Sequence, residues 1–299
     1  MVTLKVDEVR KVTVVGAGIM GSGIAQVLAM NGYDVTLIDV SDEILKKSLE
    51  SIRAGPFGLK RLVERGKLTE DQVNNIMARI HTTTDYKIGC SDADIVIEAI
   101  PEDLELKHKV FKKLEEFCPE RTILASNTSS IMISEIASVL KRPERVIGMH
   151  WFNPAPVMKL IEVIKGALTS DEVRDLIMDF SKKLGKVPIE VKDGPGFFVV
   201  RFLNAILMEA IRLYEQGVAG VKEIDEMCKL GLGWPMGPFE LMDLVGIDVI
   251  YHVAEYCHRV LADPYVAPPV TLRKIFHAGY LGKKAGSKGG WYDYLGIKK

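Results

Sequence analysis

The sequence is short of cysteine and of net charge, and both shortages restrict what the protein can do. A formal net charge of −1 does not provide the positive electrostatic potential that attracts nucleic acids or anionic membrane surfaces, so we expect neither as a partner. The four cysteines show no CxxC pair and no metal-ligand spacing, which argues against a bound metal and is typical of a reducing, cytoplasmic setting. They are Cys90, Cys118, Cys228 and Cys257.

Long apolar runs are also missing. Charged residues such as Arg201, Glu209 and Arg212 interrupt the most apolar segment, so it falls short of the about 20 residues that span a membrane. The first residues lack the apolar core of a signal peptide, and we expect no export signal. What is present is a chain of 299 residues with 47% hydrophobic content, which is enough for two globular domains.

The first half of the chain alternates short apolar runs with longer amphipathic ones, a pattern typical of parallel strands joined by helices. Between the second and third strands, residues 41–79 predict a helix pair that projects from the sheet. We therefore expect an α/β Rossmann domain with a helical insertion over residues 1–191. The predicted strands, rich in valine and isoleucine as buried strands are, cover residues 11–15, 34–39, 94–100, 122–126 and 145–150.

After residue 191 strand-like runs largely disappear. Residues 193–196 form a turn rich in glycine and proline, and the remainder predicts an all-α domain over residues 192–299. Its first helix is apolar on most of its circumference, so we expect it at the centre of a bundle or in a subunit interface. The predicted helices cover residues 197–216, 222–230, 238–261 and 270–280.

A glycine pattern follows the first strand. Gly16, Gly18 and Gly21 form GxGxxG between a valine-rich strand and a predicted helix, and Asp39 closes the next strand. This context is typical of dinucleotide binding, because the glycines let the backbone approach a pyrophosphate at the helix N-terminus. A carboxylate at position 39 would accept hydrogen bonds from the ribose hydroxyls and repel a 2′-phosphate, so NAD is the expected cofactor.

One histidine and one carboxylate stand on either side of a turn marked by prolines. His150 ends one apolar run and Glu162 lies within the next, so we expect both on strands joined by that turn. A carboxylate that faces an imidazole holds its tautomer and stabilises the imidazolium, as a general base requires. A buried histidine that is paired for structural reasons is the alternative.

Several motifs together resemble the 3-hydroxyacyl-CoA dehydrogenase family, which includes the short-chain 3-hydroxybutyryl-CoA dehydrogenases. The resemblance covers nearly the whole chain and implies a dinucleotide-binding domain followed by a helical domain that mediates homodimer formation. It also implies reversible, NAD-dependent oxidation of (S)-3-hydroxyacyl-CoA to 3-oxoacyl-CoA. The motifs include VVGAGIMGSGIA at residues 14–25, ASNTSS at 125–130, HWFNPAPVMKLIEV at 150–163, KDGPGF at 192–197 and GWPMGPFELMDLVG at 233–246.

The resemblance assigns roles to residues that match these motifs. His150 resembles the family's general base, Glu162 the carboxylate that orients it, and Ser129 the hydroxyl that contacts the substrate oxygen. A helix N-cap is another role that fits Ser129. Contacts with the cofactor are implied for four residues whose alternative role is solvated surface, namely Glu102, Lys107, Asn153 and Lys284.

The chain departs from the family pattern on the substrate side. Val200 replaces an asparagine that contacts the acyl-CoA, so we expect a weaker hold on the acyl group unless Asn204, one helical turn further on, compensates. Gly55 stands near a CoA-contacting serine of the family, which leaves only the basic character of Lys60 and Arg61 to suggest CoA binding. Two other functions stay open: a dehydrogenase of a sugar acid, in the manner of the gulonate dehydrogenases, and a non-catalytic NAD-binding protein.

Overall fold

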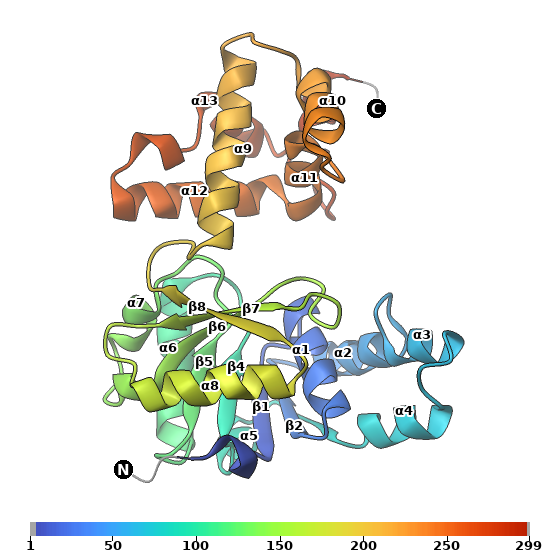
Figure 1. Ribbon diagram of the computed structural model, residues 1–299, viewed down its shortest axis with the longest axis vertical. Helices are drawn as coiled ribbons and strands as arrows, with labels where there is room; N and C mark the ends of the chain where they lie inside the picture. The colour runs from blue at the N-terminus through green and yellow to red at the C-terminus, as the bar shows by residue number, and fades with distance from the viewer. Residues whose placement is uncertain (1–3, 298–299) are drawn as a thin grey trace. The chain divides into compact units, whose positions relative to one another are not determined.

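The computed structural model describes residues 4–297 and consists of a sheet with helices around it, followed by a set of helices (Figure 1). The chain divides into two compact units between Gly194 and Pro195, shortly after the predicted end of the first domain at residue 191. The expected change from an α/β unit to an all-α unit is confirmed.

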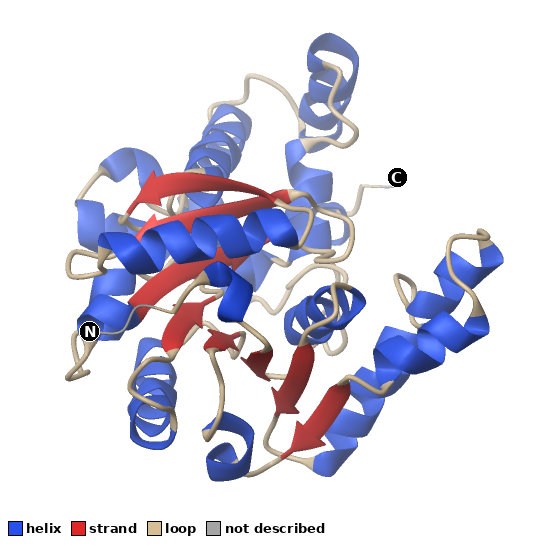
Figure 2. Cartoon of the chain, turned by 60° about the horizontal axis from the view of Figure 1, so that its bottom comes forward, coloured by secondary structure: helices blue, strands red, loops and turns tan. Residues whose placement is uncertain are grey.

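The first unit contains one eight-stranded sheet, in the order β3-β2-β1-β4-β5-β6-β7-β8 (Figure 2). Neighbouring strands run parallel except β6 and β7, which pair antiparallel. β3 was not predicted from the sequence; it is a short edge strand in which only Ile80 is buried. The strands are β1 (Lys11–Val15), β2 (Asp34–Ile38), β3 (Ile80–Thr83), β4 (Ile95–Glu98), β5 (Ile123–Ser126), β6 (Val146–Trp151), β7 (Leu160–Lys165) and β8 (Val187–Lys192).

The helical insertion between β2 and β3 contains three helices, so the predicted helix pair is wrong in number (Figure 1). Ser41 caps the first of them and Thr69 the third, each accepting a backbone N–H in the first turn. The helices of this unit are α1 (Ile19–Met30), α2 (Asp42–Ala54), α3 (Leu59–Glu64), α4 (Glu70–Met77), α5 (Tyr86–Cys90), α6 (Leu104–Phe117), α7 (Ile133–Ala137) and α8 (Asp171–Lys183), with short 3₁₀ turns η1 (Val6–Glu8) and η2 (Pro143–Arg145).

The core of the first unit follows the alternation of side chains along the strands. Val12 and Val14 of β1 pack in one large cluster with Ile24 and Leu28 of α1. Thr13, between those two valines, points to the other face, where its hydroxyl donates to the carbonyl of Gly89 in α5. Both faces of the sheet are therefore covered, as its Val- and Ile-rich strands predict.

The second unit is helical. The prediction of a single continuous helix over residues 238–261 is wrong, because two helices occupy this segment. The helix breaks at Gly246, whose φ of 113° is a conformation that residues with a Cβ rarely adopt. A short helix near the C-terminus was not predicted; its Trp291 is buried and packs edge-on against Phe239. The elements are α9 (Val199–Glu215), α10 (Val221–Leu232), α11 (Pro238–Val245), α12 (Ile247–Leu261), α13 (Val270–His277) and α14 (Trp291–Leu295), with the 3₁₀ turn η3 (Pro264–Val266).

No helix within residues 4–297 has both the length and the apolar character that a membrane span needs. In the same part of the chain, no group of three or more histidine, cysteine, aspartate and glutamate side chains is arranged to hold a metal ion.

Candidate active site

The predicted site residues of the first unit gather where the parallel strands end. The glycine loop follows β1, Asp39 follows β2, Ser129 follows β5, and His150 lies near the end of β6. Because β2, β1, β4, β5 and β6 are parallel neighbours, their carboxyl ends share one edge of the sheet. That edge is where open α/β sheets bind ligands.

The glycine loop has room only for glycine at two of its three positions. Gly16 has a φ of 98°, and a Cβ there would lie 2.5 Å from the carbonyl oxygen of Ala99. A Cβ at Gly21 would lie 1.7 Å from the carbonyl oxygen of Gly16. At Gly18, immediately before α1, a Cβ would meet nothing within 4 Å, so a phosphate group has space to approach the backbone and the helix N-terminus.

Asp39 is fixed beside this loop. Its Oδ2 accepts a hydrogen bond from the backbone N–H of Ala17 at 2.6 Å, and its Oδ1 accepts one from Val40 at 2.6 Å. The carboxylate is partly exposed, so it keeps lone pairs for the hydroxyls of a ribose whose phosphate lies on the loop. The residues present therefore fit NAD.

His150 and Glu162 form a direct cross-strand pair. β6 and β7 place them opposite each other in the antiparallel register, and His150 Nδ1 lies 2.7 Å from Glu162 Oε2. Both side chains are buried. An ionised carboxylate can only accept, so Nδ1 carries the proton and Nε2 is the basic nitrogen of the neutral ring. The prediction that the two residues face each other from adjacent strands is confirmed.

Asn127, which was not predicted from the sequence, connects β6 to the loop that contains Ser129 (residues 127–130, here called the serine loop). Asn127, directly after β5, accepts a hydrogen bond from the backbone N–H of Trp151 at 2.8 Å through its Oδ1. Trp151 follows His150 in β6, so the bond fixes the start of the serine loop beside the end of that strand. The signal was an asparagine immediately after a buried strand, at the edge where ligands bind.

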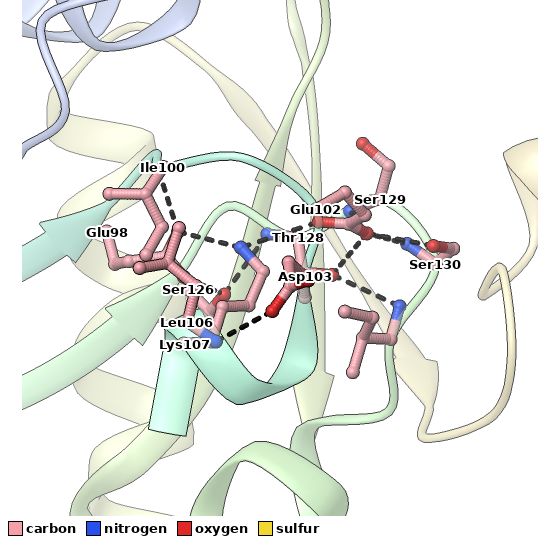
Figure 3. A network of polar contacts seen from close by, with 11 residues as sticks. Glu98, Ile100, Glu102, Asp103, Leu106, Lys107, Ser126, Thr128, Ser129 and Ser130 are labelled. Carbon is pink, nitrogen blue, oxygen red and sulfur yellow. Dashed lines mark hydrogen bonds and ion pairs between the residues drawn. The ribbon is translucent and has the colours of Figure 1, made fainter. Parts of the chain in front are cut away.

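Ser129 lies in a loop that is tied to Glu102 (Figure 3). The backbone N–H groups of Ser129 and Ser130 donate to Glu102 Oε1 at 3.0 and 2.8 Å. Ser129 does not cap a helix, because α7 begins at Ile133 and its first amides donate to Asp193. The N-cap alternative for Ser129 is therefore wrong.

Lys107, predicted to contact the cofactor, is directed into the protein. Its side chain is only 1% exposed, and its Nζ lies 2.7 Å from Glu98 Oε1 and 3.4 Å from Glu102 Oε2. The alternative of a solvated surface lysine is wrong. A cofactor contact for Lys107 and Glu102 stays a prediction, and the contacts that the structure does give them point to another role, which is developed below.

Asn153 and Lys284 lie in different units. Asn153 is exposed in the loop between β6 and β7. Lys186 fixes this loop, because its Nζ donates to the carbonyls of Ala155 and Met158 at 2.6 and 2.7 Å. Lys284 belongs to the helical unit, where its Nζ pairs with Asp248 at 2.6 Å. Their roles at the cofactor remain predictions.

The basic residues expected to meet CoA are exposed. Lys60 and Arg61 lie on α3, and Arg61 pairs with Glu64 at 3.0 Å. Gly55, near which the family resemblance implies a CoA-contacting serine, tolerates no side chain in this backbone, since a Cβ would lie 2.5 Å from the carbonyl oxygen of Ser51. The backbone between α2 and α3 therefore requires glycine at position 55, and a serine would not fit there.

Val200 packs in an apolar cluster with Val253, Cys257 and Val266. Asn204 lies on the same side of α9, as its spacing predicts, and its Nδ2 contacts the carbonyl oxygen of Val266 at 3.5 Å. However, Asn204 is buried. Only the Nδ2 end of its amide is engaged inside the helical unit, because the buried Oδ1 has no hydrogen-bond partner among the described residues. The idea that Asn204 replaces the family's asparagine at a substrate stays a prediction.

Comparison with family models and with known proteins agrees with this geometry. Residues 11–194 match the NAD-binding domain of 3-hydroxyacyl-CoA dehydrogenase, and residues 196–294 match the C-terminal domain of that enzyme. A probable 3-hydroxybutyryl-CoA dehydrogenase of Bacillus subtilis is 46% identical, over 96% of this chain and 98% of its own length. The mitochondrial hydroxyacyl-coenzyme A dehydrogenase of Homo sapiens is 45% identical, over 96% of this chain and 91% of its own length.

A solved structure of a related enzyme has the same fold. The crystal structure of (S)-3-hydroxybutyryl-CoA dehydrogenase from Ralstonia eutropha is 43% identical to this chain and superposes with a TM-score of 0.88. The match covers 93% of this chain and 97% of that one. Likeness of this extent includes both units, so it supports the fold of the helical unit as well as that of the sheet.

Proposed function

The chain belongs to the 3-hydroxyacyl-CoA dehydrogenase family and is an NAD-dependent enzyme, and from this premise we propose that its substrates are short-chain. The reaction is the reversible oxidation of (S)-3-hydroxybutyryl-CoA and similar thioesters to 3-oxoacyl-CoA. The names of the relatives from Bacillus subtilis and Ralstonia eutropha support this chain length. The observation that carries the chemistry is the His150–Glu162 pair.

His150 acts as the general base. Nε2 accepts the proton of the 3-hydroxyl group, while Glu162 holds the ring through Nδ1 and stabilises the imidazolium that forms. Bound NAD supplies the hydride acceptor for the hydrogen on C3. In the reductive direction the imidazolium returns the proton to the same oxygen. A non-catalytic protein has no need of a base aligned by a carboxylate, and the family match speaks against that alternative.

Ser129 holds the substrate oxygen through its hydroxyl group. Its backbone N–H, like that of Ser130, already donates to Glu102. These two loop amides are therefore occupied and do not form an oxyanion hole, so we assign the side-chain donor Ser129 Oγ–H to the developing negative charge.

The cofactor and CoA contacts follow from the same premise. Asp39 and the glycine loop hold the adenosine half of NAD, and Asn153 and Lys284 contact the cofactor from their loops. Lys60 and Arg61 attract the phosphates of CoA from the exposed face of α3. A 3-oxoacyl thioester therefore binds more tightly than the free acid.

We further propose a homodimer that works in the cytoplasm. The helical unit exposes large apolar side chains: Phe198 and Phe202 at the start of α9 are 61% and 58% exposed and stack on each other. A second copy of the chain would cover such a surface. Four free cysteines, three of them buried, are typical of a reducing compartment. Light scattering of the purified protein tests the dimer.

The activity is tested by following NADH absorbance with acetoacetyl-CoA, longer 3-oxoacyl-CoA thioesters, and free oxo acids that include acetoacetate. We expect the highest kcat/KM with acetoacetyl-CoA and little turnover of acids without CoA. Faster turnover of a free oxo acid than of every thioester would refute the proposed substrate, and so would faster reduction of NAD with a sugar acid than with every 3-hydroxyacyl-CoA. Slower turnover of acetoacetyl-CoA than of long-chain thioesters would refute the chain length alone.

A further inference from the structure

Three charged side chains lie close together at the end of β4, and two of them are buried. Glu98 is 0% and Lys107 1% exposed, and lysine and glutamate are almost never fully buried unless they are paired. Lys107 Nζ lies between the carboxylates of Glu98 and Glu102, at 2.7 and 3.4 Å. Such a group is costly to bury and contributes little net stability. A role other than stabilising the fold is therefore worth looking for in these three residues.

One end of this group is fixed to the sheet. Glu98 is the last residue of β4, and its Oε1 accepts the backbone N–H of Ile100 at 2.8 Å. Its Oε2 accepts the hydroxyl of Ser126 at 2.6 Å. Ser126 is the last residue of β5 and is the register partner of Glu98. Lys107 is thus held by a carboxylate that two adjacent strands keep in place.

The other end controls the loop after β5. Glu102 Oε1 alone accepts four hydrogen bonds: from Thr128 Oγ1 at 2.6 Å, from Ser130 Oγ and Ser130 N at 2.8 Å each, and from Ser129 N at 3.0 Å (Figure 3). These donors come from Ser129 and its two neighbours in sequence. The position of the Ser129 backbone therefore depends on the position of one carboxylate oxygen.

We propose that Glu98, Lys107 and Glu102 are positioning residues for Ser129, in which the fixed ion pair of Glu98 and Lys107 aims the Glu102 carboxylate at the serine loop. The inference rests on the proposed role of the Ser129 hydroxyl. It differs from the role that the family resemblance implies, in which Glu102 and Lys107 contact the cofactor themselves.

The charges needed for this role are stable near neutral pH. Loss of water around the Glu102 carboxylate opposes its ionisation, but Lys107 and the hydrogen bonds from Thr128 and Ser130 outweigh this effect and hold the pKa of Glu102 below its usual value. Burial likewise opposes the charge on Lys107, but Glu98 and Glu102 outweigh it and raise the pKa of that lysine. Glu102 and Lys107 therefore stay ionised, so the four hydrogen bonds to Glu102 are charge-assisted.

A double-mutant cycle separates positioning from direct contact. Glu102→Gln keeps an acceptor oxygen but loses the ion pair with Lys107, so the serine loop shifts. Because a misplacement of about 1 Å can cost about 100-fold in rate, we expect kcat with acetoacetyl-CoA to fall by about 10- to 100-fold, with the NADH dissociation constant changed by less than about 2-fold. In a Ser129→Ala background the same substitution should lower kcat no further.

Two further variants keep the test informative if Glu102→Gln does not fold. Glu98→Gln acts at the far end of the group, because the Glu98 carboxylate binds Ile100, Lys107 and Ser126 rather than Ser129 or Ser130. It should also lower kcat only while Ser129 is present. Asp94→Asn is the matched control. Asp94 is another buried carboxylate next to β4, but it binds Arg10, Lys11 and Arg121 at the opposite end of the strand, so kcat should be unchanged.

The outcomes are distinct. Additive losses in the cycle, or a weaker affinity for NADH at unchanged kcat, overturn the positioning role and favour direct cofactor contact. An unchanged kcat in Ser129→Ala alone overturns the positioning role together with the proposed role of Ser129, while leaving the dehydrogenase activity intact. No turnover of any 3-oxoacyl-CoA by the wild-type enzyme refutes the proposed function itself.

Discussion

Both units of the protein bury carboxylates, but they give them different partners. In the sheet unit, Glu98 and Glu162 face a lysine and a histidine, which are themselves ionisable. In the helical unit, Asp225 accepts the backbone N–H groups of Phe239 and Glu240 and the hydroxyl of Tyr292. Asp243 similarly accepts the backbone N–H of Trp291.

The type of partner indicates which carboxylates serve the reaction and which stabilise the fold. Asp225 and Asp243 satisfy the amides at the starts of α11 and α14, so they hold helices together. A carboxylate that faces an ionisable partner instead sets where a proton or a charge resides. The comparison predicts that losing Asp225 or Asp243 affects stability. Losing Glu98 or Glu162, which meet their ionisable partners at the edge where the parallel strands end, should instead affect turnover.

The largest effect is expected at Glu162. Glu162→Gln leaves His150 without a charged partner and free to take the wrong tautomer, so kcat should fall by about 100- to 10,000-fold, the range that a general base contributes. The melting temperature is the control and should change little compared with kcat. A Glu162→Gln enzyme with near wild-type turnover would break the comparison at its main point.

The opposite result is expected at Asp225. Asp225→Asn places an amide NH₂ opposite the backbone N–H of either Phe239 or Glu240, and an unsatisfied buried group costs about 1 to 3 kcal/mol. Thermal unfolding should show a melting temperature several degrees lower, while kcat measured well below that temperature stays unchanged. A selective loss of kcat at unchanged stability would contradict the structural role of Asp225.

Asp39 tests where the comparison stops. Its protein partners are backbone amides only, as in the helical unit, but the side chain is partly exposed beside the glycine loop. Asp39→Ala removes the ribose acceptor and the repulsion of a 2′-phosphate, so the preference for NADH over NADPH should narrow by about tenfold, or about 1.4 kcal/mol. The ratio of kcat/KM values measures it, and equal use of both cofactors by the wild type would refute the assignment.

The smallest effect is in the acid stability of the sheet unit. The pKa of Glu102 is lowered in the folded protein, so its contribution is present above the unfolded pKa of about 4.3 and is lost as pH falls through the folded value. Below about pH 4.3 the melting temperature of the wild type should therefore fall more steeply than that of Glu102→Gln. Parallel curves would show that Glu102 does not titrate abnormally.

The sequence predicted most of the sheet and the centre of the site. Five strands were expected from runs of valine and isoleucine, because strands buried on both faces carry that signal. The His150–Glu162 pairing followed from two apolar runs and a turn. Glycine spacing predicted the nucleotide loop, where Gly16 and Gly21 leave no room for a Cβ.

Features without a hydrophobic signal escaped prediction. β3 is an exposed edge strand whose residues include His81 and two threonines, so it carries no apolar alternation. The break at Gly246 lies inside an otherwise continuous helical pattern, in which a single glycine is often tolerated. The buried pair of Glu98 and Lys107 was not predicted, because a charged residue in a sequence suggests solvent or a ligand, whereas the contact between the two becomes evident only in three dimensions.

The most direct test of the account is the turnover of acetoacetyl-CoA by His150→Ala, measured together with its NADH affinity and its melting temperature. Removal of the base should lower kcat by about 100- to 10,000-fold, with NADH binding retained and the fold intact. Near wild-type turnover by a folded His150→Ala enzyme would contradict the assignment of the general base and with it the mechanism built on the His150–Glu162 pair.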